Sequence, residues 1–179
     1  MRLETLKRLD ELKRKFGVKN KATGPFGKIV QKILALCFYE VGFSNIVERS
    51  VQGADIDFTK NGNEKYTVEV KTTEKSFIYL SKDNIEAINE RVNDGYMPII
   101  AVLQLSLLSN WIFVKIPANS IPVGTILIES LRVYRFKVLE EQIGDIFDDI
   151  VSRHFNNILN GGEHYLKRSL RQLGILSEK

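Results

Sequence analysis

The chain of 179 residues has one cysteine, two histidines and four prolines. The single cysteine, Cys37, excludes an intramolecular disulfide and a metal cluster built on thiolates. No apolar run reaches the length of a membrane span, and the start, MRLETLKRLDELKRKFG, lacks a signal-peptide core. We therefore expect a cytoplasmic protein with no membrane partner. The glycines form no phosphate-binding loop, so no nucleotide cofactor is expected.

Charge is unevenly distributed along the chain. The net charge is +4, and residues 1–32 hold ten Lys and Arg against three Asp and Glu, whereas residues 140–149 hold five acids and no base. A basic segment of this kind attracts a phosphate backbone or an acidic partner. It is equally typical of a solvated helix face, so charge alone does not separate the two.

Hydrophobic periodicity predicts a mixed order of elements. Helical spacing is expected over 2–16, 26–41 and 81–95, and the chain after 138 reads as helices broken at Asn160-Gly161-Gly162. Strand patterns cover 44–51, 54–60, 65–72, 98–106, 110–117 and 126–138, with Asn61-Gly62 as a turn signal. A hairpin in a mixed sheet flanked by helices is an α/β architecture.

The hairpin over 53–73 carries charges that are costly to bury unless they are paired. Because side chains alternate along a strand, Asp55 and Asp57 share one face, and so do Glu69 and Lys71 on the next strand. Carboxylates, together with the Val70 carbonyl, form a ligand set suited to Mg²⁺. Lys71 beside such a cation would orient a water or stabilise charge on a phosphate. An internal ion pair is the other explanation.

These residues resemble the PD-(D/E)xK nuclease motif, with Asp57 followed twelve residues later by Glu69-Val70-Lys71. The flanking Gly42-Phe43 and Arg49-Ser50 are similar to those of archaeal Holliday junction resolvases. The resemblance covers roughly residues 24–117. It implies a restriction-endonuclease-like mixed β-sheet flanked by helices. The tail after Ile121 lies outside the resemblance, and its own pattern predicts an additional C-terminal helical region. The expected parts are an N-terminal amphipathic helix (1–20), a nuclease-like core (21–122) and a C-terminal strand and helical extension (123–179).

The resemblance also implies an activity and a partner. The family's parts would make the chain a Mg²⁺-dependent endonuclease, with Mn²⁺ able to substitute, acting on branched DNA as a homodimer. The implied catalytic residues are Asp57, Glu69, Lys71 and Gln31, and the implied metal ligands are Asp57, Glu69, Val70 and Asp55.

The sequence departs from the family pattern at two places. The proline of the motif is absent, so the aspartate assignment is open between Asp55 and Asp57; Asp57 is preferred because apolar Phe58 follows it. Gln31 stands where the family tends to carry a helix glutamate, and an amide cannot supply the same charge.

Polar and basic groups near the hairpin are candidate phosphate contacts, which position DNA without reading its sequence. The candidates are the basic residues Lys28, Lys32, Arg49 and Lys75, together with Ser50. Three functions stay open from the sequence: a junction-resolving endonuclease, a restriction or repair nuclease of the same fold, and an inactive DNA-binding module on that scaffold.

Overall fold

A computed structural model describes residues 1–17, 24–49, 54–105, 110–117 and 120–178. The central sheet has six strands in the order β6-β5-β3-β2-β1-β8. Their bounds are β1 Ser44–Arg49, β2 Ile56–Lys60, β3 Glu64–Thr73, β5 Met97–Gln104, β6 Trp111–Lys115 and β8 Leu176–Glu178. A separate two-stranded sheet pairs β4 (Phe77–Leu80) with β7 (Gly124–Leu127). The helices are α1 Leu3–Phe16, α2 Pro25–Glu40, α3 Lys82–Asn93, α4 Ile128–Leu131 and α5 Lys137–Gln172, with a 3₁₀ turn η1 over Arg132–Tyr134.

The main sheet is mixed in direction. Strands β1, β2 and β3 run as an antiparallel meander, β3 and β5 are parallel, and β6 is antiparallel to β5. The meander turns at Asn61 and Gly62, whose φ angles of 52° and 78° are the left-handed values that asparagine and glycine tolerate best. The expected α/β class, a mixed sheet flanked by helices with a further helical region at the C-terminal side, is confirmed.

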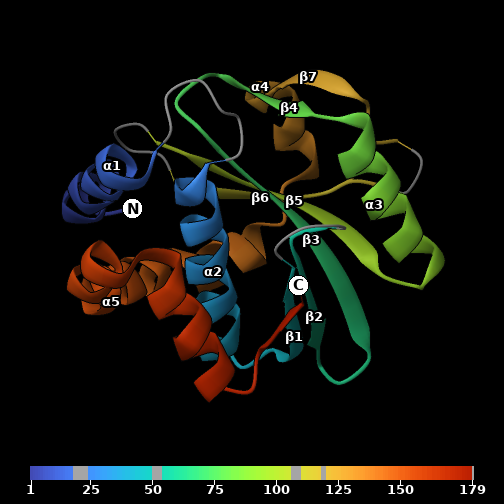
Figure 1. The fold of residues 1–179 in the computed structure, drawn as a ribbon. Helices are drawn as coiled ribbons and strands as arrows, with labels where there is room; N and C mark the ends of the chain where they lie inside the picture. Colours follow the sequence, from blue (N-terminus) through green and yellow to red (C-terminus); the bar gives the residue numbers. More distant parts are fainter. Residues whose placement is uncertain (18–23, 50–53, 106–109, 118–119, 179) are drawn as a thin grey trace.

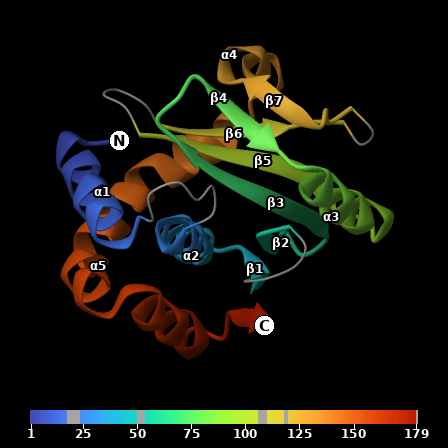
Figure 2. The ribbon, with the colours of Figure 1, turned by 45° about the horizontal axis from the view of Figure 1, so that its top comes forward.

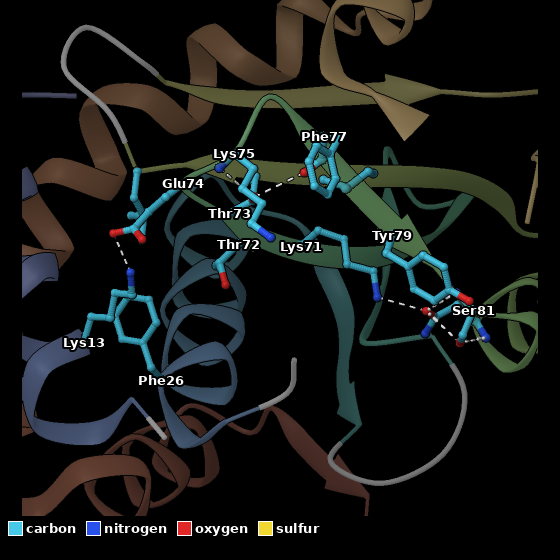
Figure 3. Close-up of a pocket in the computed structure, with 13 residues that line it drawn as sticks. Lys13, Phe26, Lys71, Thr72, Thr73, Glu74, Lys75, Phe77, Tyr79 and Ser81 are labelled. Carbon is cyan, nitrogen blue, oxygen red and sulfur yellow. Dashed lines mark hydrogen bonds and ion pairs between the residues drawn. The ribbon is translucent and has the colours of Figure 1, made fainter. Parts of the chain in front are cut away.

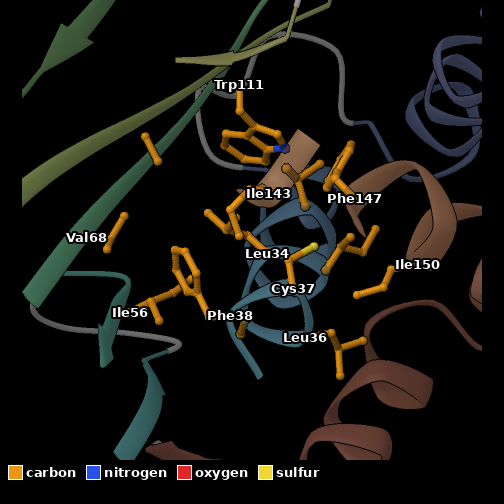
Figure 4. Packing of buried hydrophobic residues seen from close by; sticks show 14 of the residues in the cluster. Leu34, Leu36, Cys37, Phe38, Ile56, Val68, Trp111, Ile143, Phe147 and Ile150 are labelled. Atoms are coloured by element: carbon orange, nitrogen blue, oxygen red, sulfur yellow. The ribbon is translucent and has the colours of Figure 1, made fainter. Parts of the chain in front are cut away.

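Different elements cover the two faces of the sheet. Figures 1 and 2 show α1, α2 and α5 on one face, with α3, α4 and the β4–β7 pair on the other. The helical face contains the larger hydrophobic cluster, in which Phe38 of α2, Trp111 of β6 and Phe147 of α5 are buried (Figure 4). Cys37 lies fully buried in it. A smaller cluster around Ile100, Val102 and Ile126 lies on the opposite face.

The N-terminal helix and the C-terminal extension share the core of the central part. Leu9 and Leu12 of α1 and Ile143 and Ile150 of α5 belong to the same hydrophobic cluster as the sheet residues. Helix α5 kinks at Gly162, where φ is +54° and an added Cβ would lie 3.1 Å from the Phe16 ring of α1. The expected boundaries at residues 20 and 122 therefore do not separate independent cores.

One expected strand is wrong over most of its length. The pattern over 126–138 predicts a strand, but only its first two residues belong to β7, and α4 and η1 follow. Ile128 and Leu131 are buried three residues apart, which is the spacing of one helical turn. Strand β4 was not predicted, because its four residues form a run too short to stand out from the loop. No helix in the described ranges is long and apolar enough to cross a membrane.

Candidate active site on the open face of the sheet

Two charged clusters lie on the sheet face that α3 and the β4–β7 pair partly cover. We call Asp55, Glu69 and Lys71 the carboxylate cluster, and Asp57, Arg49 and Arg91 the arginine cluster. Both depend on the register of the meander, which places Asp57 opposite Thr67 and Ile56 opposite Val68. Alternation then puts Thr67, Glu69 and Lys71 on the same face of β3.

Asp55 lies immediately before β2 and points at β3. Its Oδ2 accepts a hydrogen bond of 2.7 Å from the Val70 amide. Burial raises the pKa of Asp55 well above its ordinary value, and the neighbouring Glu69 carboxylate raises it further, while the Val70 N–H and the Lys71 ammonium act in the opposite direction. Holding both carboxylates charged therefore requires more positive charge than Lys71 alone provides.

Glu69 is the second carboxylate of this cluster and is almost completely buried. Its Oε1 accepts an ion-pair contact of 2.7 Å from Lys71 Nζ, whereas its Oε2 has no hydrogen-bond partner among the described residues. Burial raises the pKa of Glu69, and the Lys71 ammonium opposes that shift. An unpartnered buried carboxylate oxygen is costly, and a cation or a bound water would offset that cost.

Lys71 is positioned from two sides. Besides Glu69, its Nζ donates a 2.9 Å hydrogen bond to Asn84 Oδ1. Asn84 is fixed in turn by the capping box of α3: its amide N–H donates to Ser81 Oγ, and its Oδ1 accepts from the Ser81 amide. The start of α3 thereby holds the lysine at the edge of the carboxylate cluster.

Asp57, the aspartate preferred from the sequence, has different surroundings. It is 1% exposed, and its Oδ2 accepts hydrogen bonds from Arg49 Nη1 and from Arg91, whose Nε lies 2.9 Å away. Arg91 also packs over the Tyr96 ring, with its guanidinium carbon 4.6 Å from the centroid. Asp57 Oδ1 and Thr67 Oγ1 lack hydrogen-bond partners among the described residues. The structure therefore groups Asp55, and not Asp57, with Glu69 and Lys71.

Gln31 lies on the opposite face of the sheet and contacts the backbone that carries the carboxylates. Its buried Nε2 lies 2.8 Å from Glu48 Oε1, 2.6 Å from the Arg49 carbonyl and 2.9 Å from the Asp55 carbonyl. These contacts tie α2 to β1 and to the segment just before β2. Gln31 is thus placed to position Asp55 through its main chain.

Lys32, expected to contact DNA, is instead fully buried. Its Nζ lies 2.7 Å from Glu48 Oε1 and 3.2 Å from Glu163 Oε1, and its side chain is 0% exposed. The expectation that it contacts phosphate is wrong for this structure, because its charge is balanced internally and does not reach the surface. The carboxylate of Glu163 comes from α5, outside the segment that suggested the resemblance.

The other expected DNA contacts have different environments. Lys75 is exposed beside the Phe77 ring, Lys28 is half-buried on α2, and Arg49 belongs to the arginine cluster. Ser50 lies outside the described residues.

Sequence reasoning missed Asn84 and Arg91, both of which reach the candidate site from α3. A signal for them exists: Asn84, Ile88 and Arg91 recur at helical spacing, and Ile88 is buried. A helix face that carries one apolar residue between two polar residues indicates that the polar groups flank the contact with the sheet.

The oxygen donors of the carboxylate cluster suit a divalent cation that takes few ligands from the protein. Among the described residues, no three His, Cys, Asp or Glu side chains are grouped to hold a metal ion. Mg²⁺, however, is commonly bound by one or two carboxylates, with waters and substrate phosphates completing its shell. Asp55 and Glu69, with the unpartnered Oε2 of Glu69, fit that smaller requirement.

The chain shows a partial likeness to solved structures. No family model matches the chain, and no curated protein matches its sequence at a significant level. A solved structure that it resembles is that of Hjc from Archaeoglobus fulgidus, a Holliday junction resolvase, with 19% sequence identity and a TM-score of 0.48. The match covers 61% of this chain and 93% of that one. At this TM-score and identity the likeness does not establish a function, so the function is argued from the residues of the site.

Proposed function

We propose that the chain is a metal-dependent DNA endonuclease that hydrolyses phosphodiester bonds in branched DNA, in the manner of a Holliday junction resolvase. The observation that supports this most is the carboxylate cluster. Two buried carboxylates there share one lysine, and one carboxylate oxygen lacks a hydrogen-bond partner among the described residues. A purely structural ion pair would need only one of the two carboxylates.

Asp55 and Glu69 are the residues that would hold the cation. When bound, Mg²⁺ or Mn²⁺ would supply Lewis-acid polarisation of the scissile phosphate and a water of lowered pKa. The carbonyl of Val70 stays a predicted third ligand, while its amide holds the Asp55 carboxylate in place.

Lys71 would contact the reacting phosphate. Its ammonium is fixed by Glu69 and Asn84 and therefore needs little reorganisation to stabilise negative charge that develops on phosphate oxygens. Arg49 and Arg91 both contact Asp57, and Arg91 also pairs with the exposed Asp94. These guanidinium groups would contact the neighbouring phosphates of a DNA strand.

The test is cleavage of a labelled four-way junction beside a matched linear duplex and a fork, each with Mg²⁺, with Mn²⁺ and with EDTA. We expect metal-dependent cutting of the junction and a loss of about 10²–10³-fold in Lys71→Ala, because the variant removes one preorganised charge. Lys82→Ala, on an exposed lysine of α3, is the control and should cut normally.

The substrates separate the related proposals. Cutting of all three DNAs with metal would retain the nuclease and replace the junction resolvase by a restriction or repair enzyme. Tight DNA binding without cutting in the presence of either metal would contradict the proposal that the chain is an enzyme.

An inactive DNA-binding module is the second candidate function, and Gln31 favours it. The amide at this position donates to two carbonyls and to Glu48, so it adds no negative charge to the carboxylate cluster.

A homodimer, which two symmetric cuts would require, is part of the first proposal and is tested by the solution mass of the complex with junction DNA.

A further inference from the structure

A groove of about 570 Å³ opens beside Lys71 and is not used by the chemistry described above. It lies between the C-terminal end of α1, the β3–β4 connection and the start of α3. Figure 3 shows Lys71, Lys75, Phe77 and Tyr79 around it, with Lys13 and Phe26 on the far side. Because Lys71 lines both the groove and the carboxylate cluster, the two sites are continuous.

The lining carries more positive than negative charge. It contains three lysines, Lys13, Lys71 and Lys75, and one acid, Glu74, which pairs with Lys13. Ser81, the N-cap of α3, also lines it, and this brings the partial positive end of a 12-residue helix to the rim. The groove therefore favours a negatively charged ligand. Charge alone does not separate a nucleic acid from an acidic protein surface, and the other groups that line the groove decide between them.

The groove also presents aromatic faces. Along β4, Ile78 and Leu80 are buried while Tyr79 is 60% exposed, so alternation directs the Tyr79 ring away from the core. Phe77 lies on the same side of the strand, and Lys75 Nζ lies 5.1 Å from the centroid of its ring. An exposed tyrosine next to a lysine-capped phenylalanine combines stacking surface with positive charge.

This combination matches the chemistry of single-stranded nucleic acid. Grooves that bind unpaired strands use basic groups along the backbone and aromatic rings on which bases stack. Bases in a duplex are already stacked on one another and do not offer a free face to a protein ring. A groove with both features beside a phosphodiester site thus distinguishes paired from unpaired DNA.

We propose that this groove binds an unpaired nucleotide of the DNA strand that passes the carboxylate cluster, with its base stacked on Tyr79 and its phosphates near Lys71 and Lys75. The proposal rests on the proposed function as a DNA nuclease and narrows its substrate to DNA with single-stranded nucleotides next to the cut. Flaps, gaps and overhangs provide such nucleotides, whereas a fully paired four-way junction provides them only where base pairs at its branch point open.

The experiment measures binding in EDTA, so that it does not depend on cutting. The probes are a blunt duplex and duplexes with a five-nucleotide 5′ or 3′ tail, each tail carrying 2-aminopurine at its first unpaired position. Stacking quenches 2-aminopurine, so fluorescence reports contact with a ring and anisotropy reports affinity. The variants are Tyr79→Ala, Tyr79→Phe and, as a matched control, Tyr134→Ala, which removes another exposed tyrosine away from the groove.

We expect the native chain to bind one tailed duplex about tenfold more tightly than blunt duplex and to quench its probe. Tyr79→Ala should lose both the preference and the quenching, Tyr79→Phe should keep both, and Tyr134→Ala should behave as the native chain. Tyr79 is largely exposed, so its removal should leave the melting temperature nearly unchanged, and melting curves check this.

Three results would overturn the proposal, and they differ in what they mean for the proposed nuclease. Equal affinity for blunt and tailed DNA, unchanged by Tyr79→Ala, would show that the groove does not bind an unpaired nucleotide. It would not affect the proposal that the chain is a nuclease. No binding to any DNA would overturn both. Retained quenching in Tyr79→Ala would also count against the groove, because it would place the stacking ring elsewhere.

Discussion

Asp55 and Asp57 lie two residues apart in the sequence, yet the charged groups around them differ. In the arginine cluster, Asp57 is paired with two guanidinium groups, one of which also pairs with the exposed Asp94. In the carboxylate cluster, two carboxylates meet one ammonium. The charge of Asp57 is therefore compensated within the protein, whereas the carboxylate cluster is short of positive charge. A buried acid is a candidate ligand only when its neighbours leave its charge unbalanced.

The largest expected effect concerns the arginine cluster. Asp57→Asn would remove the buried carboxylate that both Arg49 and Arg91 contact, although Arg91 would keep its contact with the exposed Asp94. Removing one partner of such a network costs about 3–5 kcal/mol. We expect a loss of that order in the free energy of unfolding, measured by urea denaturation, and a loss within about 0.5 kcal/mol for the exposed Asp145→Asn. Native-like stability of Asp57→Asn would show that this acid is not a structural one.

A smaller effect is expected at Gln31. Gln31→Glu restores the residue type of the family pattern but removes the donor shared by Glu48 and two carbonyls, and it places a second carboxylate beside Glu48. Leaving buried acceptors unsatisfied costs about 1–3 kcal/mol. We expect a loss of stability of that size and no gain in cutting. A gain in metal-dependent cutting would instead show that the amide limits the activity of the native chain.

Local sequence patterns predicted what local geometry determines. Strand alternation predicted that Asp55 and Asp57 share one face of their strand and that Glu69 and Lys71 share one face of the next, and the Asn61-Gly62 turn brings the two strands together. Alternation cannot separate two acids on the same face, and that choice depends on partners far along the chain. Arg91, which forms hydrogen bonds with Asp57, lies 34 residues away on α3, and no local pattern specifies where α3 packs on the sheet.

Burial of charge was the other feature beyond sequence reasoning. Lys32 looks like a surface lysine on an amphipathic helix, and only the return of α5 brings Glu163 next to it. The burial of Lys32 depends on residues far apart in sequence. The hairpin and the helices flanking the sheet were predictable because each depends on residues close in sequence.

Asp55 and Glu69 are proposed to hold a divalent cation, and thermal melting with increasing Mg²⁺ measures whether the folded chain binds one. The native chain should melt about 5–10 °C higher at saturating Mg²⁺, because a ligand bound only by the folded state adds to its stability. Asp55→Asn can keep an acceptor for the Val70 amide and removes one of two repelling charges. It should therefore melt at or above the native temperature without metal and lose the Mg²⁺ response, which Asp145→Asn keeps. A native chain that does not respond to Mg²⁺, with Asp55→Asn less stable than it, would contradict the account and make the cluster a structural ion pair.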